Sequence, residues 1–290
     1  MRPYEILDVF TSTPLAGNPL AVVHEADGLS GERMQAIAAE FNLSETIFLH
    51  AATNGTVPAR IFTPRYEMPF AGHPTVGGSI ALAAREGLSH VTLSVPAGRV
   101  EVDVTERGEG VRRATLAAPV LPRAEPLGVP VAGLARLVGV DESEIVTGGD
   151  GAMWPSRVSS GPWFTAIPLN GLEALATARF AMEEAAVLGD APSSLYLVAK
   201  DADGYRVRMF APHGGTPEDP ATGSAAVALA AMIMAADPPG DGVHPVTIRQ
   251  GVEMGRPSEI FVTLEVAGGA LTRVTLSGEA VVVAQGRLLA

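Results

Sequence analysis

The stretch "AGHPTVGGSIALAA", residues 71–84, returns in altered form as "EDPATGSAAVALAA", residues 218–231. Each copy contains a titratable residue and a glycine turn and continues into an alanine-rich run. Because each run is apolar nearly all round, it predicts a helix enclosed by sheet rather than one lying on a surface. Alignment on Pro74 and Pro220 places three pairs of residues opposite each other: His73 with Asp219, Gly77 with Gly223, and Gly78 with Ser224. The duplication predicts that the two copies are halves of one active site.

Strand-like segments precede and follow both copies, so the repeat extends over the chain. Runs such as "YEILDVFT" (4–11) and "YRVRMFAP" (205–212) predict strands. The order predicts an α+β fold of two pseudo-symmetric lobes, each a mostly antiparallel sheet around one central helix. The expected boundaries are an N-terminal lobe at 1–118, a proline-rich linker at 119–130 and a C-terminal lobe at 131–290. An alternative stays open in which the last strand returns to the first lobe.

The composition excludes several classes of function. The 290 residues carry a formal net charge of −12, and 47% of them are hydrophobic. This balance fits a globular protein and argues against nonspecific binding to nucleic acid or anionic membranes. No apolar run is long enough for a membrane helix, and the N-terminus lacks a signal-peptide layout, so a cytoplasmic location is expected.

The residues that cofactors and metals need are scarce. There is no cysteine, which rules out disulfides, thiolate nucleophiles and cysteine-ligated metals. The single lysine, Lys200, borders a predicted hairpin turn and is a poor candidate for a pyridoxal phosphate Schiff base. The histidines do not form a paired metal motif, and no phosphate-binding glycine loop is present. We therefore expect neither a cofactor nor a metal.

Three polar positions could carry chemistry, and each has a plainer alternative. Glu45 in "NLSETIF" has apolar neighbours that would desolvate it, as suits a general acid/base, yet it could be a surface glutamate. His73 precedes an expected helix start, where backbone N–H groups can hold an anion, yet it could be a capping or packed histidine. Asp219 or Thr222 could simply cap the second helix. The duplication adds weight to the catalytic reading, because two helix starts could face one small carboxylate.

Five segments then occur in an order that resembles the PhzF-like family, named for an isomerase of phenazine biosynthesis. They are "DVFTSTPLAGNPLAVV" (8–23), "MQAIAAEFNLSETIF" (34–48), "YEMPFAGHPTVGGSIALA" (66–83), "EDPATGSAAVALA" (218–230) and "QGVEMGRPSEI" (250–260). The resemblance extends to the closing "LSGEAVVVAQGRL" (276–288) and covers nearly the whole chain. It implies the diaminopimelate-epimerase-like fold, with two pseudo-symmetric lobes that each curl a sheet around a central helix.

The resemblance also implies roles for individual residues. Glu45 looks like the general acid/base, and His73, Asp219 and Ser224 look like the polar residues that complete the catalytic site. The implied substrate-binding residues are Gly72, Gly77, Gly223, Thr222 and Asn18. Epimerases and racemases of this fold usually carry a cysteine in each glycine turn. This chain has none, so racemisation by two thiols is excluded.

The expected function is cofactor-independent isomerisation of a small carboxylate-bearing metabolite. Glu45 would remove a proton and return it at another carbon, so that a double bond moves. Two alternatives stay open: an epimerase or dehydratase on the same scaffold, and a binding protein without turnover. The resemblance further implies a homodimer. The near absence of lysine beside 19 arginines suggests a GC-rich bacterial genome as the source.

Overall fold

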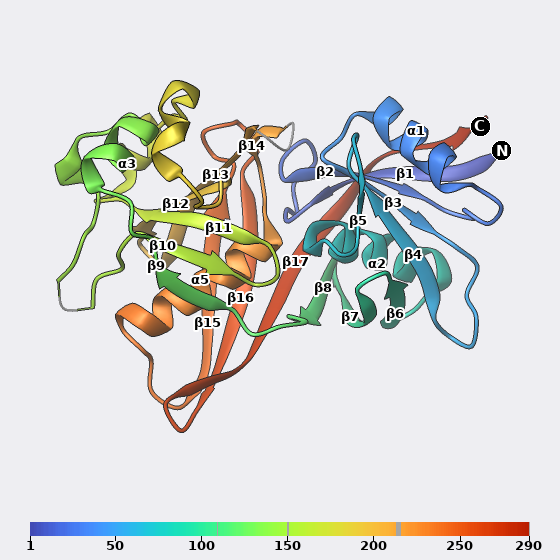
Figure 1. Cartoon of the computed structure of the whole chain (residues 1–290). Coiled ribbons are helices and arrows are strands. Elements are labelled where there is room, and N and C mark those ends of the chain that lie inside the picture. Colours follow the sequence, from blue (N-terminus) through green and yellow to red (C-terminus); the bar gives the residue numbers. More distant parts are fainter. Residues whose placement is uncertain (109, 150, 213–215, 290) are drawn as a thin grey trace. The chain divides into compact units, whose positions relative to one another are not determined.

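The computed structural model describes residues 1–108, 110–149, 151–212 and 216–289. They form two compact units, each with its own strands and its own central helix (Figure 1). The first unit comprises Met1–Ala117, Arg256–Glu259 and Leu276–Ala290, and the second comprises Ala118–Gly255 and Ile260–Thr275. The four residues Arg256–Glu259 therefore belong to the first unit although the chain on both sides of them belongs to the second.

The first unit begins with a sheet and a covering helix, and a second helix follows. Its elements are β1 (Arg2–Val9), β2 (Asn18–Val23), α1 (Gly31–Phe41), β3 (Glu45–Leu49), β4 (Val57–Phe62), β5 (Glu67–Met68), α2 (Gly72–Glu86), β6 (His90–Val95), β7 (Gly98–Gly108) and β8 (Val111–Ala117). Helix α1 starts where the Ser30 side chain accepts a hydrogen bond from the Arg33 N–H at 3.2 Å, and it ends at a left-handed Asn42. A serine at the start and an asparagine in the left-handed conformation at the end are both common at helix termini.

The second unit repeats this layout with more helical turns between its strands. Its elements are β9 (Arg123–Pro126), α3 (Val131–Val138), η1 (Glu142–Glu144), β10 (Ser156–Ser159), β11 (Trp163–Pro168), α4 (Leu172–Thr177), η2 (Met182–Leu188), β12 (Leu195–Asp201), β13 (Gly204–Ala211), β14 (Thr216–Asp219), α5 (Gly223–Ala236) and β15 (Gly242–Gln250). Strands β16 (Ser258–Ala267) and β17 (Ala270–Leu288) each contribute residues to both units. The segment 119–130, expected as a linker, lies in the second unit, and its residues Arg123–Pro126 pair with β10 as strand β9.

Strand pairing follows the same order in the two units. In the first, β1–β2 is antiparallel, β2–β3 parallel, β3–β4 and β4–β5 antiparallel, and β4–β6 parallel. In the second, β10–β11 is antiparallel, β11–β12 parallel, β12–β13 and β13–β14 antiparallel, and β13–β15 parallel. The central helix follows β5 in one unit and β14 in the other. This repetition confirms the predicted pseudo-symmetric α+β fold.

The helix starts correct the sequence alignment. Helix α2 begins at Gly72, three residues after Pro69, and α5 begins at Gly223, three residues after Pro220. Pro69 is therefore the counterpart of Pro220, and the structural pairs are Gly72 with Gly223 and His73 with Ser224. The alignment on Pro74 was wrong because it matched two prolines that lie on opposite sides of the helix start. His73 accordingly lies inside the first turn of α2 and not before the helix.

Gly77 and Gly78 lie in the middle of α2, and not in a turn as expected. A Cβ on Gly77 would lie 2.4 Å from Leu20 Cδ2, and one on Gly78 would lie 2.9 Å from Ile47 Cδ1. Only a residue without a side chain lets the helix approach the sheet this closely. These glycines therefore allow α2 to pack against β2 and β3. Because Gly77 lies in the helix interior, its N–H donates a hydrogen bond within the helix.

An arginine–glutamate pair is duplicated along with the strands. Arg60 on β4 makes two hydrogen bonds to Glu67 on β5, at 2.7 and 2.6 Å. Arg208 on β13 makes two to Glu218 on β14, at 2.9 and 3.0 Å. Each guanidinium also lies over a phenylalanine two residues further along its strand, 5.1 Å from the Phe62 ring centroid and 4.8 Å from that of Phe210. Both glutamates stand at the same distance in sequence before a central helix, so the pairs brace the two helix starts alike.

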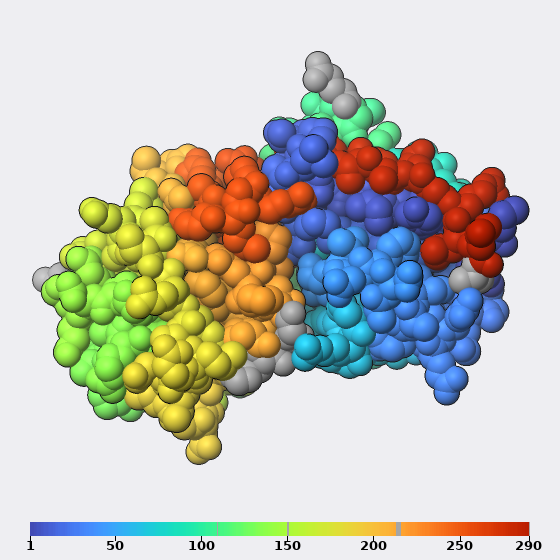
Figure 2. Space-filling model, turned by 90° about the horizontal axis from the view of Figure 1, so that it is seen from above, coloured from blue at the N-terminus to red at the C-terminus, as the bar shows by residue number. Residues whose placement is uncertain are grey.

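The last part of β17 lies along β1 at the surface of the first unit, where the red and blue segments of Figure 2 run together. The pairing is antiparallel from Arg2 opposite Leu288 to Val9 opposite Ala280. Within the described part of the chain, each helix is too short or too polar to traverse a lipid bilayer.

Candidate active site

Glu45 and His73 form a direct pair in the first unit. Glu45 is the first residue of β3, and its side chain is 19% exposed. His73 is the second residue of α2, and its side chain is 5% exposed. The Nδ1 atom of His73 lies 2.9 Å from Oε2 of Glu45. The close approach of α2 to β3 thus brings together two residues that the sequence separates by 28 positions.

The other ring nitrogen of His73 defines where the protons lie. Its Nε2 atom is 3.1 Å from the main-chain oxygen of Asn18, which can only accept a hydrogen bond. Nε2 must therefore carry a proton. If the ring carried no other proton, a lone pair on Nδ1 would face the carboxylate of Glu45. The contact between Nδ1 and Glu45 therefore requires a second proton, which lies between these two groups. The pair is either imidazolium with carboxylate or neutral imidazole with carboxylic acid, and both forms suit a group that accepts and returns a proton.

Asn18 supports this pair on both of its polar sides. The residue is 1% exposed, its main-chain oxygen faces His73, and its side-chain oxygen accepts a hydrogen bond from Ser44 Oγ at 2.9 Å. Ser44 immediately precedes Glu45, so one asparagine holds both the histidine and the start of the strand that carries the glutamate. The phenyl ring of Phe10 completes the surroundings, with its centroid 6.4 Å from that of His73.

Asp219 and Thr222 form the corresponding polar cluster of the second unit. Thr222 Oγ1 donates to Asp219 Oδ2 at 2.5 Å. The Gln250 side chain donates to the main-chain oxygen of Asp219 at 2.7 Å and to Thr222 Oγ1 at 3.1 Å, and its oxygen accepts from the Thr222 N–H at 3.1 Å. Gln250 is fully buried. The carboxylate is thereby fixed at the end of β14, just before α5 begins.

Helix starts Gly72–His73 and Gly223–Ser224 each present backbone N–H groups that have no partner inside their helix. The main-chain oxygen of Ser224 accepts a hydrogen bond from Ser160 Oγ at 2.7 Å, which holds the first turn of α5. The positive end of each helix dipole makes these positions favourable for an anion.

The plainer alternatives for these residues can now be compared with the geometry. Thr222 occupies the N-cap position of α5, but its side chain makes no capping hydrogen bond, and its hydroxyl donates to Asp219 instead. Glu45 belongs to a strand and is mostly covered, which differs from a surface glutamate in a loop. His73 is indeed packed, yet both of its nitrogens make polar contacts, and one of these is to Glu45.

The structural counterpart of Glu45 in the second unit is apolar. Glu45 opens β3 opposite Leu20, the third residue of β2. Leu195 opens β12 opposite Thr165, the third residue of β11, and is fully buried. The scaffold is therefore duplicated, whereas, among the residues that the structure describes, a carboxylate at this strand position that pairs with a residue of the central helix is found in the first unit and not in the second.

Sequence reasoning missed three supporting residues: Ser44, Gln250 and Arg256. Gln250 and Arg256 lie in "QGVEMGRPSEI", a segment that carries part of the family resemblance but whose residue types alone indicate no role for these two residues. Local spacing gives no signal for them because their partners lie tens to hundreds of residues away. Ser44 adjoins Glu45, but its bond to Asn18 depends on the parallel pairing of β2 with β3.

A cleft of about 690 Å³ lies elsewhere in the second unit, among α3, η1, α4 and η2. None of the expected site residues lines it. Across the described residues there is also no group of three or more histidine, aspartate or glutamate side chains arranged to hold a metal ion.

Comparison with known proteins shows which family the chain belongs to. The family model described as phenazine biosynthesis-like protein matches residues 7–286. An uncharacterized isomerase of Mesorhizobium japonicum is 42% identical, with 99% of this chain and 98% of that protein covered. The trans-2,3-dihydro-3-hydroxyanthranilate isomerase of Pseudomonas aeruginosa is 37% identical, with 99% of both covered.

Solved structures show the same fold. A Bacillus anthracis protein of the PhzF family has a TM-score of 0.89 at 25% identity, covering 100% of this chain and 99% of that one. A Pseudomonas aeruginosa protein described as a predicted epimerase has a TM-score of 0.80 at 31% identity, with both chains fully covered. A hydroxyproline epimerase of Agrobacterium vitis shares the fold alone, at 14% identity and a TM-score of 0.62 over 99% of this chain and 93% of that one. The chain is an isomerase-type enzyme and belongs to the phenazine biosynthesis-like PhzC-PhzF family.

Proposed function

We propose that this enzyme isomerises a small carboxylate-bearing metabolite without a cofactor, with Glu45 as its general acid/base. The observation that carries the proposal is the 2.9 Å contact between Glu45 and His73. The Nε2 atom of His73 donates its hydrogen bond elsewhere, to the main-chain oxygen of Asn18. This arrangement supplies a proton-sharing pair at the edge of a buried helix. General acid/base catalysis of this kind contributes roughly 10²- to 10⁴-fold to a rate.

The proposed reaction keeps every proton accounted for. Glu45 starts as the carboxylate, with His73 protonated on both nitrogens. The carboxylate takes a proton from a substrate carbon made acidic by a neighbouring double bond or carboxylate, and the electron pair shifts into the substrate's π system. Glu45, now a carboxylic acid, returns the proton to another carbon, and the double bond ends one or more positions away. Enzyme and proton inventory are then restored.

The proposal also gives the second unit a part in the same reaction. We assign Asp219 and Ser224 to positioning and relaying the proton, and the N–H groups at Gly72 and Gly223 to holding the substrate carboxylate or the developing anion. The support is the free N–H groups at each helix start and the fixed Asp219–Thr222 contact at 2.5 Å. The helix interior uses the N–H of Gly77, so Gly77 has a packing role in this assignment, and Asn18 supports His73.

Epimerisation is the second candidate function, because a 31% identical protein is described as a predicted epimerase. A two-base epimerase needs an acid/base on each face of the substrate. The chain has no cysteine, and Leu195 occupies the counterpart of the Glu45 position. These two observations favour a single base that both removes and returns the proton. A product with a moved double bond would indicate isomerisation, whereas a product that differs from the substrate only by inversion at the carbon that loses its proton would indicate epimerisation.

The experiment is proton NMR in D₂O with purified enzyme and a panel of small unsaturated, amino and hydroxy carboxylic acids. The first probe is trans-2,3-dihydro-3-hydroxyanthranilate, the substrate in the name of the 37% identical relative. We expect one panel member to give a product with a moved double bond, with deuterium at the reprotonated carbon to the extent that the protonated Glu45 exchanges with D₂O before it returns its proton. Glu45→Gln should give neither the product nor the deuterium. Turnover by Glu45→Gln at the wild-type rate would overturn the role of Glu45. Binding of a panel member by wild type without turnover or exchange would favour a binding protein.

Two expectations from the resemblance accompany this proposal. A homodimer predicts a mass in solution twice that of the 29.9 kDa chain, which light scattering measures directly. The cytoplasmic location stays a prediction from the sequence and is tested by cell fractionation.

A further inference from the structure

We propose that Arg256 is a positioning residue for the catalytic pair, and that it acts by holding the loop between β1 and β2. This inference rests on the proposed function of Glu45 and His73 and adds a device that controls the protonation state of His73. Arg256 lies 240 residues after Ala16, one of its partners, in the short segment Arg256–Glu259 that belongs to the first unit.

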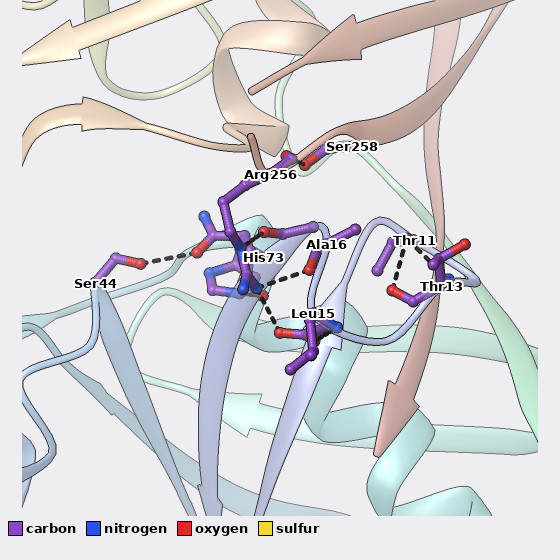
Figure 3. A network of polar contacts seen from close by, with 11 residues as sticks. Thr11, Thr13, Leu15, Ala16, Ser44, His73, Arg256 and Ser258 are labelled. Carbon is purple, nitrogen blue, oxygen red and sulfur yellow. Dashed lines mark hydrogen bonds and ion pairs between the residues drawn. The ribbon is translucent and has the colours of Figure 1, made fainter. Parts of the chain in front are cut away.

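The guanidinium of Arg256 makes two contacts to this loop and a third to Asp8, near the end of β1. Its Nε donates to the main-chain oxygen of Gly17 at 2.9 Å. Its Nη2 donates to the main-chain oxygen of Ala16 at 2.7 Å and to Asp8 Oδ1 at 2.6 Å. Figure 3 shows Arg256 with its dashed contacts toward the loop that carries Ala16 and Leu15. A planar guanidinium can satisfy several acceptors at fixed angles, which a lysine cannot do.

The carboxylate of Asp8, on strand β1, links Arg256 to the loop. Its side chain is 2% exposed, and Oδ2 accepts a hydrogen bond from the Leu15 N–H at 2.6 Å. A buried carboxylate needs both a positive partner and hydrogen bonds, and Arg256 and the Leu15 N–H supply them. Two main-chain hydrogen bonds add to the clamp: from the Gly17 N–H to Pro257 O at 3.0 Å and from the Glu259 N–H to Phe10 O at 2.7 Å.

The loop itself is held in a conformation that needs outside support. Phe10, Leu15 and Gly17 have φ angles of 63°, 67° and 65°, which are unfavourable for the two residues with side chains. A Cβ on Gly17 would lie 2.4 Å from the main-chain oxygen of Val9, so the turn there tolerates no side chain. Contacts from a distant segment therefore hold the loop in a form that its own sequence does not favour.

The end of this loop is the acceptor that fixes His73. Gly17, whose oxygen Arg256 binds, precedes Asn18, whose main-chain oxygen receives the Nε2 proton of His73 at 3.1 Å. If that oxygen moves, the ring is free to place its proton on Nδ1 and to leave Nε2 bare. The proton shared with Glu45 would then lose its defined position. Arg256 thereby controls the tautomer of a histidine that it does not touch.

The test uses Arg256→Gln, the conservative Arg256→Lys, and Asp8→Asn as a second way to break the clamp. Arg113→Gln is the matched control, because Arg113 lies in the same unit, is 26% exposed against 27% for Arg256, and pairs with Glu279 at 2.8 Å. The main readout is the ¹⁵N chemical shift of the His73 ring nitrogens over a pH series, assigned by comparison with His73→Gln. This measurement needs no substrate, so it remains decisive if the proposed reaction is wrong.

We expect wild type and Arg113→Gln to keep a protonated Nε2 throughout the pH series. Arg256→Gln and Asp8→Asn should show a mixture of tautomers, with Arg256→Lys in between. On the panel member that wild type converts, kcat should fall about 10- to 100-fold with KM nearly constant, and the pH profile should shift. If folded Arg256→Gln and Asp8→Asn keep the ¹⁵N shifts of Arg113→Gln, the inference is overturned, even if their activity falls.

Discussion

The starts of α2 and α5 have the same scaffold but different chemistry. Both helices begin three residues after a proline, and both are braced by an arginine–glutamate pair that lies over a phenylalanine. Where α2 presents His73 to Glu45, α5 presents Ser224, and the position of Glu45 is taken by Leu195. Within the described residues, the parts that place a helix start are thus present in both units, whereas the contact between a histidine of the central helix and a strand glutamate is found in the first unit and not in the second.

The Arg208–Glu218 pair of the second unit is more buried than the Arg60–Glu67 pair of the first. Breaking the Arg208–Glu218 pair should therefore have the largest effect on stability. Arg208 is 9% exposed and also donates to the main-chain oxygens of Leu175, Ala176 and Ala178 at the end of α4. We expect Arg208→Gln to lower the free energy of unfolding by about 3–5 kcal/mol, because Glu218 is left without its partner. Urea denaturation measures this. Arg136→Gln, which breaks an exposed pair with Glu184, is the control and should cost under about 1 kcal/mol.

His73 occupies a position that is a serine, Ser224, in the second unit. Replacing His73 should affect activity rather than folding. We expect His73→Gln to reduce kcat about 100-fold, because Glu45 loses the group that shares its proton. Steady-state kinetics on the panel member that wild type converts measures the loss. His24→Gln is a matched control, since His24 is 3% exposed and faces Glu5 at 3.5 Å in the same unit. Equal losses in both variants would show that burial of a histidine, and not its proton, is what matters.

The Arg60–Glu67 pair of the first unit is more exposed, and breaking it should have a smaller effect on stability than breaking the Arg208–Glu218 pair. Arg60 and Glu67 are 34% and 31% exposed, and water screens part of their attraction. We expect Arg60→Gln to lower the free energy of unfolding by about 1 kcal/mol, measured in the same denaturation series as Arg208→Gln. A loss as large as that of Arg208→Gln would mean that the two braces contribute equally despite their different burial.

The same brace should give a small dependence of stability on pH. Hydrogen bonds from Arg60 hold the pKa of Glu67 below its ordinary value of 4.5. A lowered folded-state pKa means that the stabilisation is present above 4.5 and is lost as the pH falls through the folded value. The difference in unfolding free energy between wild type and Glu67→Gln should therefore shrink between about pH 6 and about pH 3. A difference that stays constant over this range would show that the charge of Glu67 contributes nothing.

Features set by local sequence patterns could be predicted, and long-range ones could not. The cap of helix α1 at Ser30 and its end at Asn42 are features of the local kind, because capping depends on neighbouring residues. The alignment of the two copies failed because both contain nearby prolines and glycines, and only the helix starts show which ones correspond. Strand β9 was missed because four prolines in 119–130 look like a linker, although a proline can lie at the end of a strand.

The same difference between local and long-range features applies to the candidate site. Glu45 and His73 were expected from their residue types and from the resemblance, and the structure adds their 2.9 Å contact. The support from Asn18 and Arg256 could not be predicted, since it depends on how a loop with three positive φ angles folds against a segment far along the chain. The sequence does not show that Leu195 is the counterpart of Glu45, because this correspondence depends on the pairing of Leu195 with Thr165.

The central claim is that one base, Glu45, carries the proton in both directions. The most direct test follows product formation and deuterium entry by proton NMR in D₂O, with wild type, Glu45→Gln and Asp219→Asn compared on the panel member that wild type converts. The account predicts no product and no deuterium with Glu45→Gln, and slowed but measurable turnover with Asp219→Asn. Deuterium that still enters a substrate carbon with Glu45→Gln, but not with Asp219→Asn, would contradict it.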